Sequence, residues 1–431
     1  MHSQFMMPSY ERYVDSGFDW IGQVPDHWEV TKLGSCLTPV SVKNRPDLPL
    51  LSITRELGVI ERDVEDQDSN HNFIPDDLSG YKLLKAGQFG MNKMKAWQGS
   101  YGVSQHTGIV SPAYYVFDFT KHIEPKFFNW AIRSKLYISY FGSASDGVRI
   151  GQWDLSKSRM KTIPFVLPSS IEQVSIANFL DQKTAQIDEA IAVKEQQIAL
   201  LKERKQIIIQ QAVTQGLDPN VPMKDSGIDW IGNIPKHWQV KRLKYVLEER
   251  NERSKTGEEP LFMVSQVYGL VVRADYHEKA EVASSNIDNK VVYENDLVFN
   301  KLKAHLGVFF KSSIQYKGLV SPDYAVYNCK AHIENAKYLE LLFRNPKYIE
   351  QFIIRATGIV EGLIRLYTGD LFDIAVPVAP KQEQRDILKF IESQSKAFDN
   401  AIKIQKQQID KLKEYKTTLI NSAVTGKIKV A

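Results

Sequence analysis

The chain repeats itself, and this internal repeat constrains its fold more than any other feature of the sequence. Residues 15–28 read DSGFDWIGQVPDHW and residues 225–238 read DSGIDWIGNIPKHW, with ten of fourteen positions identical. The match continues further along, where residues 108–112 (GIVSP) correspond to residues 318–322 (GLVSP). The 431 residues are therefore a tandem duplication of a unit of about 210 residues, and each copy is expected to fold in the same way.

Composition narrows the class of protein. A mass of 49.3 kDa, 43% hydrophobic and 25% charged residues are typical of a soluble globular protein of two or three domains. Cys36 and Cys329 are the only cysteines, which excludes a disulfide framework and a cysteine-based zinc site. The sequence also lacks a long apolar run and a signal peptide. We therefore expect a cytoplasmic protein that is neither secreted nor embedded in a membrane.

Each repeat has two parts of different texture. Residues 15–168 and 217–380 mix short apolar runs with Gly, Pro and Asn, which predicts two similar α/β or α+β globular domains. Residues 169–216 read as one long helix, and residues 381–431 read as a second long helix with a tail. Residues 1–14 are left as an N-terminal extension.

Both predicted helices carry a narrow apolar stripe with heptad spacing. The stripe consists of Leu180, Ile187, Ile191, Ile198, Leu201 and Ile208 in the first helix, and of Leu388, Ile391, Phe398, Ile402, Ile409, Leu412 and Leu419 in the second. Each helix could simply pack on its own domain. A stripe sustained over some 40 residues instead favours an intramolecular coiled coil, antiparallel because the first helix enters domain two and the second leaves it. Such a pair would act as a spacer that holds the two domains at opposite ends.

Charge is distributed unevenly within each domain. Residues 15–77 hold 13 acidic and 5 basic residues, whereas residues 78–168 hold 4 acidic and 12 basic ones. Residues 297–370 hold 10 basic and 6 acidic residues, so the bias recurs in the second copy. Because aromatic residues are interspersed with these cations, the later part of each domain is typical of a polyanion-binding face. A solvated surface without a partner is the alternative.

Two short basic segments are the best candidates for contact with DNA. They are NKMKAW (residues 92–97) and NKLKAH (residues 300–305), whose Lys and Asn side chains can donate to phosphates or purine edges beside a flat ring. The candidate residues are Lys93, Lys95, Trp97 and Arg149 in the first copy, and Lys301, Lys303, His305 and Arg365 in the second. The lysines could instead alternate outward along an ordinary strand, and the two arginines could form ion pairs with Asp154 and Asp370.

Residues for catalysis are not grouped in any familiar pattern. The sequence lacks a Gly-rich loop with Gly-Lys-Ser/Thr for nucleotide phosphates and a Gly-x-Gly turn for S-adenosylmethionine. The nine histidines show no metal-ligand spacing, and His27 and His237 are expected to be structural. The tryptophans of the repeated motif, Trp20/Trp28 and Trp230/Trp238, are expected to anchor the start of each domain. The residues therefore indicate a binding protein.

The sequence resembles the specificity subunit of type I restriction-modification enzymes over essentially its whole length. The resemblance rests on the twice-used DSGxDWIGxxPxHW opening, on the GxVSP segment, and on a proline followed by Glu-Gln at the start of each helix (Pro168 to Gln173, Pro380 to Gln384). The two proline-to-Glu-Gln spacings differ by one residue.

The resemblance implies two target-recognition domains that read the halves of a split, asymmetric sequence in double-stranded DNA. It implies no catalysis by this chain and no cofactor bound to it. The partners would be two modification subunits that carry S-adenosylmethionine and methylate adenine, and restriction subunits that use ATP and Mg²⁺ for translocation and cleavage. A stand-alone coiled-coil scaffold, or a methyltransferase or nuclease fragment, is the alternative.

Overall fold

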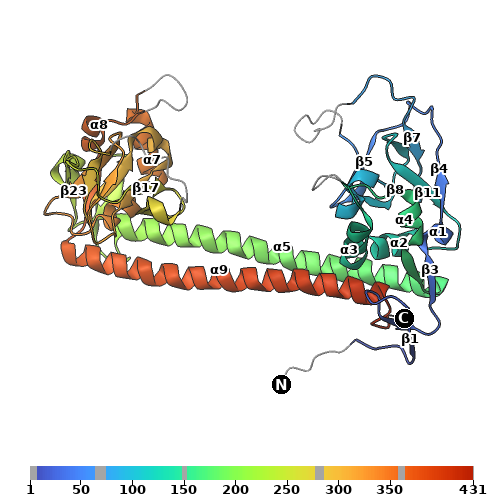
Figure 1. Cartoon of the computed structure of the whole chain (residues 1–431). Helices are drawn as coiled ribbons and strands as arrows, with labels where there is room; N and C mark the ends of the chain where they lie inside the picture. The colour runs from blue at the N-terminus through green and yellow to red at the C-terminus, as the bar shows by residue number, and fades with distance from the viewer. Residues whose placement is uncertain (1–6, 64–73, 148–152, 277–285, 358–364, 431) are drawn as a thin grey trace. The chain divides into compact units, whose positions relative to one another are not determined.

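The structure is a computed structural model and describes residues 7–63, 74–147, 153–276, 286–357 and 365–430 (Figure 1). The chain divides into two compact units. Unit 1 comprises residues 1–195 and 406–431, and unit 2 comprises residues 196–405. Each unit therefore contains one predicted domain and about one half of each long helix.

Unit 1 is an α+β domain built around a four-stranded antiparallel sheet. The order of this sheet is β4 (Leu37–Val40), β11 (Tyr115–Phe119), β8 (Phe89–Met91) and β9 (Tyr101–Val103). Four two-stranded pairs surround it: β1 (Tyr13–Asp15) with β2 (Gln23–Pro25), β3 (Glu29–Lys32) with β12 (Pro164–Leu167), β5 (Leu51–Thr54) with β6 (Gly58–Glu61), and β7 (Lys82–Leu84) with β10 (Gly108–Val110). The short helices are α1 (Leu33–Cys36), η1 (Lys93–Gln98), α2 (Pro125–Ile132), α3 (Lys135–Ala144) and α4 (Lys157–Thr162).

Unit 2 repeats this topology. Its central sheet has the order β16 (Leu247–Glu249), β23 (Tyr324–Cys329), β20 (Leu297–Asn300) and β21 (Phe309–Lys311). The pairs are β13 (Met223–Asp225) with β14 (Asn233–Pro235), β15 (Gln239–Arg242) with β24 (Ala375–Val378), β17 (Phe262–Ser265) with β18 (Gly269–Val272), and β19 (Lys290–Val292) with β22 (Gly318–Val320). The short helices are η2 (Leu243–Tyr245), η3 (Arg273–Asp275), η4 (Lys301–Leu306), α6 (Lys337–Phe343), α7 (Pro346–Arg355) and α8 (Thr368–Phe372). The strand order confirms that the two domains are copies of one fold.

Aromatic side chains fill the core of each domain. In unit 1, Phe89 stacks on Phe117 and meets Phe128 edge-on, with ring centroids 6.0 and 5.2 Å apart. In unit 2, Phe299 and Phe309 stack at 3.9 Å. All these rings are fully buried. The central strands are buried on both faces, because every residue of β8 and the first three residues of β20 are buried.

The repeated tryptophans are anchors, as the sequence predicts. Trp28 is 4% exposed and Trp238 is fully buried. Trp20 and Trp230 are partly buried and meet Tyr137 and Tyr348 edge-on, at 5.2 and 4.9 Å. The opening motif therefore fastens the first strands of each copy to its core.

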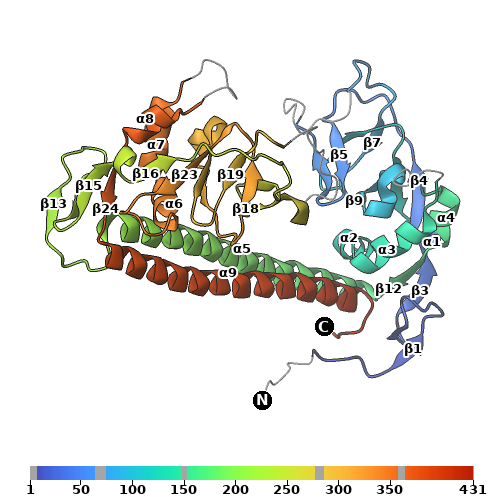
Figure 2. The same cartoon turned by 60° about the vertical axis from the view of Figure 1, so that its left-hand side comes forward.

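The two long helices are α5 (Ser170–Gln215) and α9 (Lys381–Val424), close to the boundaries expected from the sequence. Within each unit, the parts of the two helices lie side by side and run in opposite directions (Figures 1 and 2). Their pairing is visible within each unit: Lys416 contacts Asp188 in unit 1, and Lys205 contacts Asp399 in unit 2, both at 2.7 Å. The antiparallel arrangement of the helices is therefore confirmed.

All thirteen predicted stripe residues are buried or partly buried. Leu180 is fully buried, and Ile187, Ile198, Ile391, Ile402, Ile409 and Leu419 are less than 10% exposed. Toward the domains the same stripe also joins the domain cores, because Leu180 and Ile187 pack in the core of unit 1 and Ile391 in that of unit 2. Helix pairing and packing on the domains, which the sequence poses as alternatives, thus occur together.

Residues 7–14 are part of unit 1 and contact the end of the chain. Tyr13 donates its hydroxyl to the carbonyl of Gly426 at 3.1 Å, and the amide of Lys429 donates to Pro8 at 2.6 Å. Gly426 lies in the turn after α9 with φ +73°, and a Cβ there would lie 2.4 Å from the Pro25 ring, so only glycine fits this close approach. The tail after α9 therefore packs on the first strands of the same unit.

Candidate nucleic-acid interface

The two predicted basic segments form short 3₁₀ helices, not strands with alternating lysines. Segment η1 follows β8 and η4 follows β20, each at the end of a central strand. The amide of Leu155 donates to the carbonyl of Lys93, and the amide of Leu366 donates to the carbonyl of Lys301. Each segment is thus held by the backbone that leads into α4 or α8. This placement corrects the alternative of an ordinary strand.

In unit 1 the predicted residues have different surroundings. Lys93 forms an ion pair with Asp154 at 2.9 Å and is about one-third exposed, whereas Lys95 is exposed. Trp97 is partly buried against Trp153, with ring centroids 5.0 Å apart. Asn92 is buried and caps η1 by accepting from the amide of Met94, so its side chain serves the fold. Arg149 lies outside the described residues.

In unit 2 the predicted cations also differ from one another. Lys301 lies 3.7 Å from Glu249 and is 17% exposed, whereas Lys303 is exposed. Arg365 forms an ion pair with Asp323 at 3.3 Å. The sequence suggests a different partner, Asp370. His305 lies within η4, but its side chain is outside the described part of the chain.

Arg149 and Arg365 align in the sequence, because each lies five residues before an Asp-Leu pair, but the structure gives a different alignment. Asp154 forms a backbone β-bridge with Asp146, and Arg365 forms one with Thr357. The leucine that follows each of them donates its amide to the carbonyl of the matched lysine, Lys93 in η1 or Lys301 in η4. Arg365 therefore occupies the place of Asp154, not that of Arg149. The sequence alone hides this correspondence, because only the backbone hydrogen bonds fix the register.

Three further lysines of unit 1 extend the basic segment. Lys82, at the start of β7, donates to the carbonyl of Tyr114 at 2.6 Å, and the ammonium of Lys157 lies 4.8 Å from the centre of the Tyr115 ring. Burial lowers the pKa of Lys82, and the nearby charges of Lys157, Lys43 and Lys93 lower it further. We call Lys43, Lys82, Lys93 and Lys157 the unit 1 lysine cluster. Like charges this close favour a bound anion.

Sequence reasoning missed most of this cluster. Lys82 and Lys157 lie 11 and 64 residues from Lys93 along the chain, and only the sheet and α4 bring them together. The available signal was the match of Lys82 with Lys290 in the repeat, because each begins the strand that pairs with the GxV segment.

The matched position in unit 2 carries its own counter-charge. Lys290 is nearly fully buried, and its ammonium lies 3.4 Å from a carboxylate oxygen of Glu249. The same oxygen lies 3.7 Å from the ammonium of Lys301. Burial lowers the pKa of Lys290, the charge of Lys301 lowers it further, and Glu249 opposes both effects. Glu249 therefore joins the two lysines that correspond to Lys82 and Lys93.

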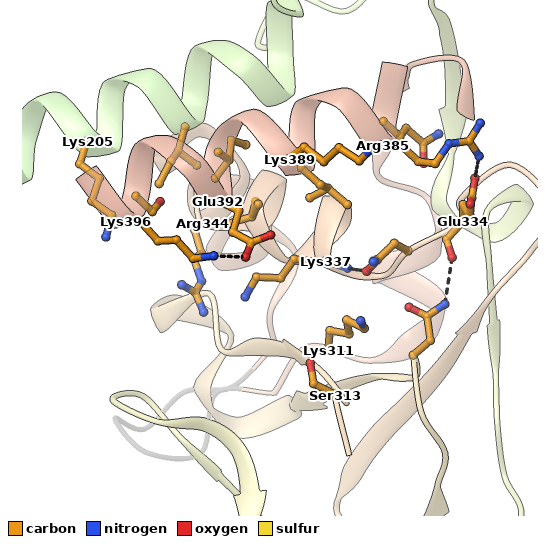
Figure 3. Close-up of a pocket in the computed structure, with 18 of the residues that line it drawn as sticks. Lys205, Lys311, Ser313, Glu334, Lys337, Arg344, Arg385, Lys389, Glu392 and Lys396 are labelled. Carbon is orange, nitrogen blue, oxygen red and sulfur yellow. Dashed lines mark hydrogen bonds and ion pairs between the residues drawn. The ribbon is translucent and has the colours of Figure 1, made fainter. Parts of the chain in front are cut away.

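Unit 2 also contains an open cavity of about 900 Å³ between α9, α5 and the domain (Figure 3). Ion pairs join Arg385 to Glu334 and Lys396 to Glu392 along its wall, and Lys311 lies on the opposite side. The cavity is lined in part by Leu341, which occupies the place of Trp130 in unit 1. Trp130 donates to Asp181 at 2.8 Å and covers the helix there. The smaller side chain of Leu341 leaves part of this space unfilled in the second copy.

Two properties of the described residues bear on other kinds of function. Within them, no group of three or more His, Cys, Asp or Glu side chains could hold a metal ion. No helix in the same part of the chain is long and apolar enough to cross a membrane.

Comparison with known proteins shows that the chain is similar to specificity subunits of type I restriction enzymes. A putative type I restriction enzyme specificity subunit, MjaX from Methanocaldococcus jannaschii, is 23% identical over 95% of this chain and 96% of its own length. The specificity subunit of the Escherichia coli type I enzyme EcoKI is 25% identical over 64% of this chain and 59% of its own. No family model matches the chain.

Solved structures share the fold. A chain from a study of complex assembly and conformational transition of the type I R-M system matches with a TM-score of 0.67 and 13% identity, covering 93% of this chain and 98% of the other. The HsdS subunit from Thermoanaerobacter tengcongensis matches with a TM-score of 0.57 and 15% identity, covering 94% and 98%. These similarities confirm the fold class and the resemblance drawn from the sequence.

Proposed function

We propose that this chain, a homologue of the specificity subunits of type I restriction enzymes, is the DNA-recognition subunit of such a complex. Its two domains each read one half of a bipartite DNA target. Because the domains differ between their shared motifs, the two half-sites differ in sequence. Phosphate contacts position the complex, and contacts to base edges select the target.

The duplication carries this proposal. The chain has two copies of one α+β domain, each followed by a helix that pairs antiparallel with the other. It matches the MjaX subunit over 96% of that protein's length and the two solved structures over 98% of theirs. The unit 1 lysine cluster supports contact with a polyanion, because Lys82 and Lys157 lie against Tyr114 and Tyr115 at the start of β11, which pairs with the end of β8 just before Lys93.

We further propose that the chain itself is not catalytic. Two modification subunits would bring S-adenosylmethionine, and restriction subunits would bring ATP, Mg²⁺, translocation and cleavage. In each unit, the exposed sides of α5 and α9 offer a polar surface for these partners, since most of their residues away from the stripe are polar and exposed. A cytoplasmic location is part of the same proposal.

A domain exchange tests the proposal. Residues 217–380 are replaced by the matching domain of a relative, and methylated adenines are mapped across the genome in cells that carry the wild-type or the exchanged gene. We expect one half-site to change while the other is retained. An unchanged set of methylation sites would contradict the assignment. A deletion of the gene provides the control, because all sites that depend on the chain should then disappear.

A second experiment tests the helices as a spacer. Four residues inserted into α5 and four into α9 at the matched position lengthen the pair by about 6 Å, and we expect the gap between half-sites to widen by about one or two base pairs. A gap of constant length would show that the helices do not set it. A scaffold without DNA contact predicts instead that the complex has no salt-dependent affinity for duplex DNA.

A further inference from the structure

The two repeats contain a matched pair of lysines with different charges around them. In unit 2, Glu249 of the edge strand β16 places one carboxylate oxygen 3.4 Å from Lys290 and 3.7 Å from Lys301. In unit 1, the corresponding lysines are Lys82 and Lys93. The residue that corresponds to Glu249 there is Pro39, because Glu249 pairs with Tyr327 as Pro39 pairs with Phe117. The first copy therefore keeps the two lysines and lacks the carboxylate.

The first copy also adds positive charge at a place where the second copy is neutral. Lys157 at the start of α4 reaches over Tyr115, whereas Thr368 at the start of α8 has no charge and lies 3.2 Å from the hydroxyl of Tyr327. The ammonium of Lys82 donates a hydrogen bond to the carbonyl of Tyr114. Lys93 keeps one acidic neighbour, Asp154, which is about half exposed. The lysines beside Pro39 are thus only partly compensated.

We propose that a DNA backbone phosphate binds in unit 1 beside Pro39, between Lys82, Lys93 and Lys157. This phosphate would take the place that the Glu249 carboxylate occupies in unit 2. This inference rests on the proposed function, since the phosphate belongs to the bound DNA. Its consequence is asymmetry: unit 1 contributes a phosphate contact at this place, whereas unit 2 neutralises the matched lysines with its own side chain.

Accessibility agrees with this difference. Lys290 is about 4% exposed at its side chain and Lys301 is 17% exposed, so Glu249 and the surrounding strands enclose the site in unit 2. In unit 1, Lys93 is 30% exposed, Lys82 is partly buried, and Lys43 and Lys157 are exposed. Pro39 itself is exposed on the edge strand β4, where a proline does not interrupt a central ladder.

The test transfers the carboxylate from one repeat to the other. Pro39→Glu in the full chain, purified with its modification subunits, should place an anion beside Lys82 and Lys93. Binding of a fluorescently labelled duplex is then measured between about 50 and 200 mM KCl. The slope of log affinity against log salt should become shallower by about 0.9 for each phosphate that the variant no longer neutralises, with weaker binding at low salt. Gln23→Glu at the exposed start of β2, in the same unit, adds an equal charge and should leave the slope unchanged.

Lys82→Met provides a second variant that does not alter the edge strand. It should also make the slope shallower, whereas Lys32→Met at the exposed end of β3 in the same unit should not. A slope equal to that of the wild type in both Pro39→Glu and Lys82→Met, with steep salt dependence in the wild type, would overturn the inference and leave the proposed function intact. A wild-type complex without salt-dependent affinity for the duplex would overturn the proposed function, and the phosphate site with it.

Discussion

Trp28 donates its indole N–H to the carboxylate of Glu172 at 3.2 Å, across 144 residues of sequence. The same carboxylate contacts the ring of His27 at 3.0 Å. The second copy repeats both contacts, because Trp238 and His237 bind Glu383 at 2.9 and 2.7 Å. The Pro-x-His-Trp motif and the Glu-Gln motif of each repeat are therefore two halves of one contact, which fixes the first turn of a long helix to its own domain.

The first prediction concerns this contact. Trp28→Phe removes an N–H donor to a carboxylate that is only 13% exposed, and should lower the free energy of unfolding of unit 1 by about 2 kcal/mol. Amide hydrogen exchange should become faster in the first turns of α5 and stay unchanged in those of α9. Trp238→Phe should show the reverse.

Trp20→Phe is the matched control for that experiment. The indole N–H of Trp20 is buried without a hydrogen-bond partner among the residues that the structure describes, so the substitution removes no hydrogen bond. It should leave the exchange of the first turn of α5 unchanged. Equal effects of Trp20→Phe and Trp28→Phe on that turn would show that ring volume, not the bond to Glu172, holds the helix.

The second prediction concerns pH. The hydrogen bond to Glu172 raises the pKa of His27. Burial acts to raise the pKa of Glu172, but hydrogen bonds from His27, Ser169 and Trp28 outweigh it and hold this pKa at about 2. The stability that His27 contributes to unit 1 is therefore fully present below its unfolded pKa of about 6.5, and it is lost as pH rises through its higher folded pKa. The stability that Glu172 contributes is fully present above about pH 4.5, its ordinary pKa, and it is lost as pH falls toward its folded pKa of about 2.

The measurement is thermal unfolding of the wild type and of His27→Gln from about pH 6 to about pH 8.5. The wild type should lose stability relative to the variant as pH rises, by less than about 1 kcal/mol, since the His27 side chain is 49% exposed. Parallel pH profiles of the two proteins would mean that the imidazole is not protonated in this contact.

The third prediction concerns the helix pair. Lys416–Asp188 and Lys205–Asp399 are equivalent ion pairs in the two units, and in each the lysine is about one-quarter exposed. Double-mutant cycles with Met and Asn substitutions should give a coupling of about 0.5 kcal/mol for each pair, reduced by salt. Lys396–Glu392 lies within α9 and is about 70% exposed, so its coupling should be smaller. A larger coupling in that control would show that proximity along one helix outweighs pairing between helices.

The sequence predicts features that depend on periodicity. The stripes of α5 and α9 are read from heptad spacing alone, and every stripe residue is buried or partly buried. The domains follow from the repeat. What could not be predicted depends on contacts between distant segments, such as Lys82 near Lys157, or Asp154 in the place of Arg365. The sequence presents Asn92 as a candidate donor to DNA, whereas in the structure its side chain caps η1. The sequence pattern does not reveal the turn that this cap requires.

The fourth prediction concerns the cavity of unit 2. Trp130 of α2 contacts Asp181 of α5, and Leu341 of α6 holds the same place beside Glu392 of α9. The correspondence is fixed by the neighbouring residues: Asn129 accepts from the amide of Val103 at 3.0 Å, as Glu340 accepts from that of Lys311 at 2.9 Å. The two positions can therefore be exchanged as a pair.

Trp130→Leu removes a hydrogen bond to a carboxylate and leaves a gap against α5, so the free energy of unfolding of unit 1 should fall by about 2 kcal/mol. Leu341→Trp should fill part of the cavity in unit 2 and bring an indole N–H toward Glu392, with a gain of stability of up to about 1 kcal/mol. Thermal unfolding and hydrogen exchange of α5 and α9 measure both effects. A neutral Trp130→Leu would show that this residue does not fasten the helix, whereas a destabilising Leu341→Trp would show that the place is already closed by Lys337 and Arg344, which both bind Glu340.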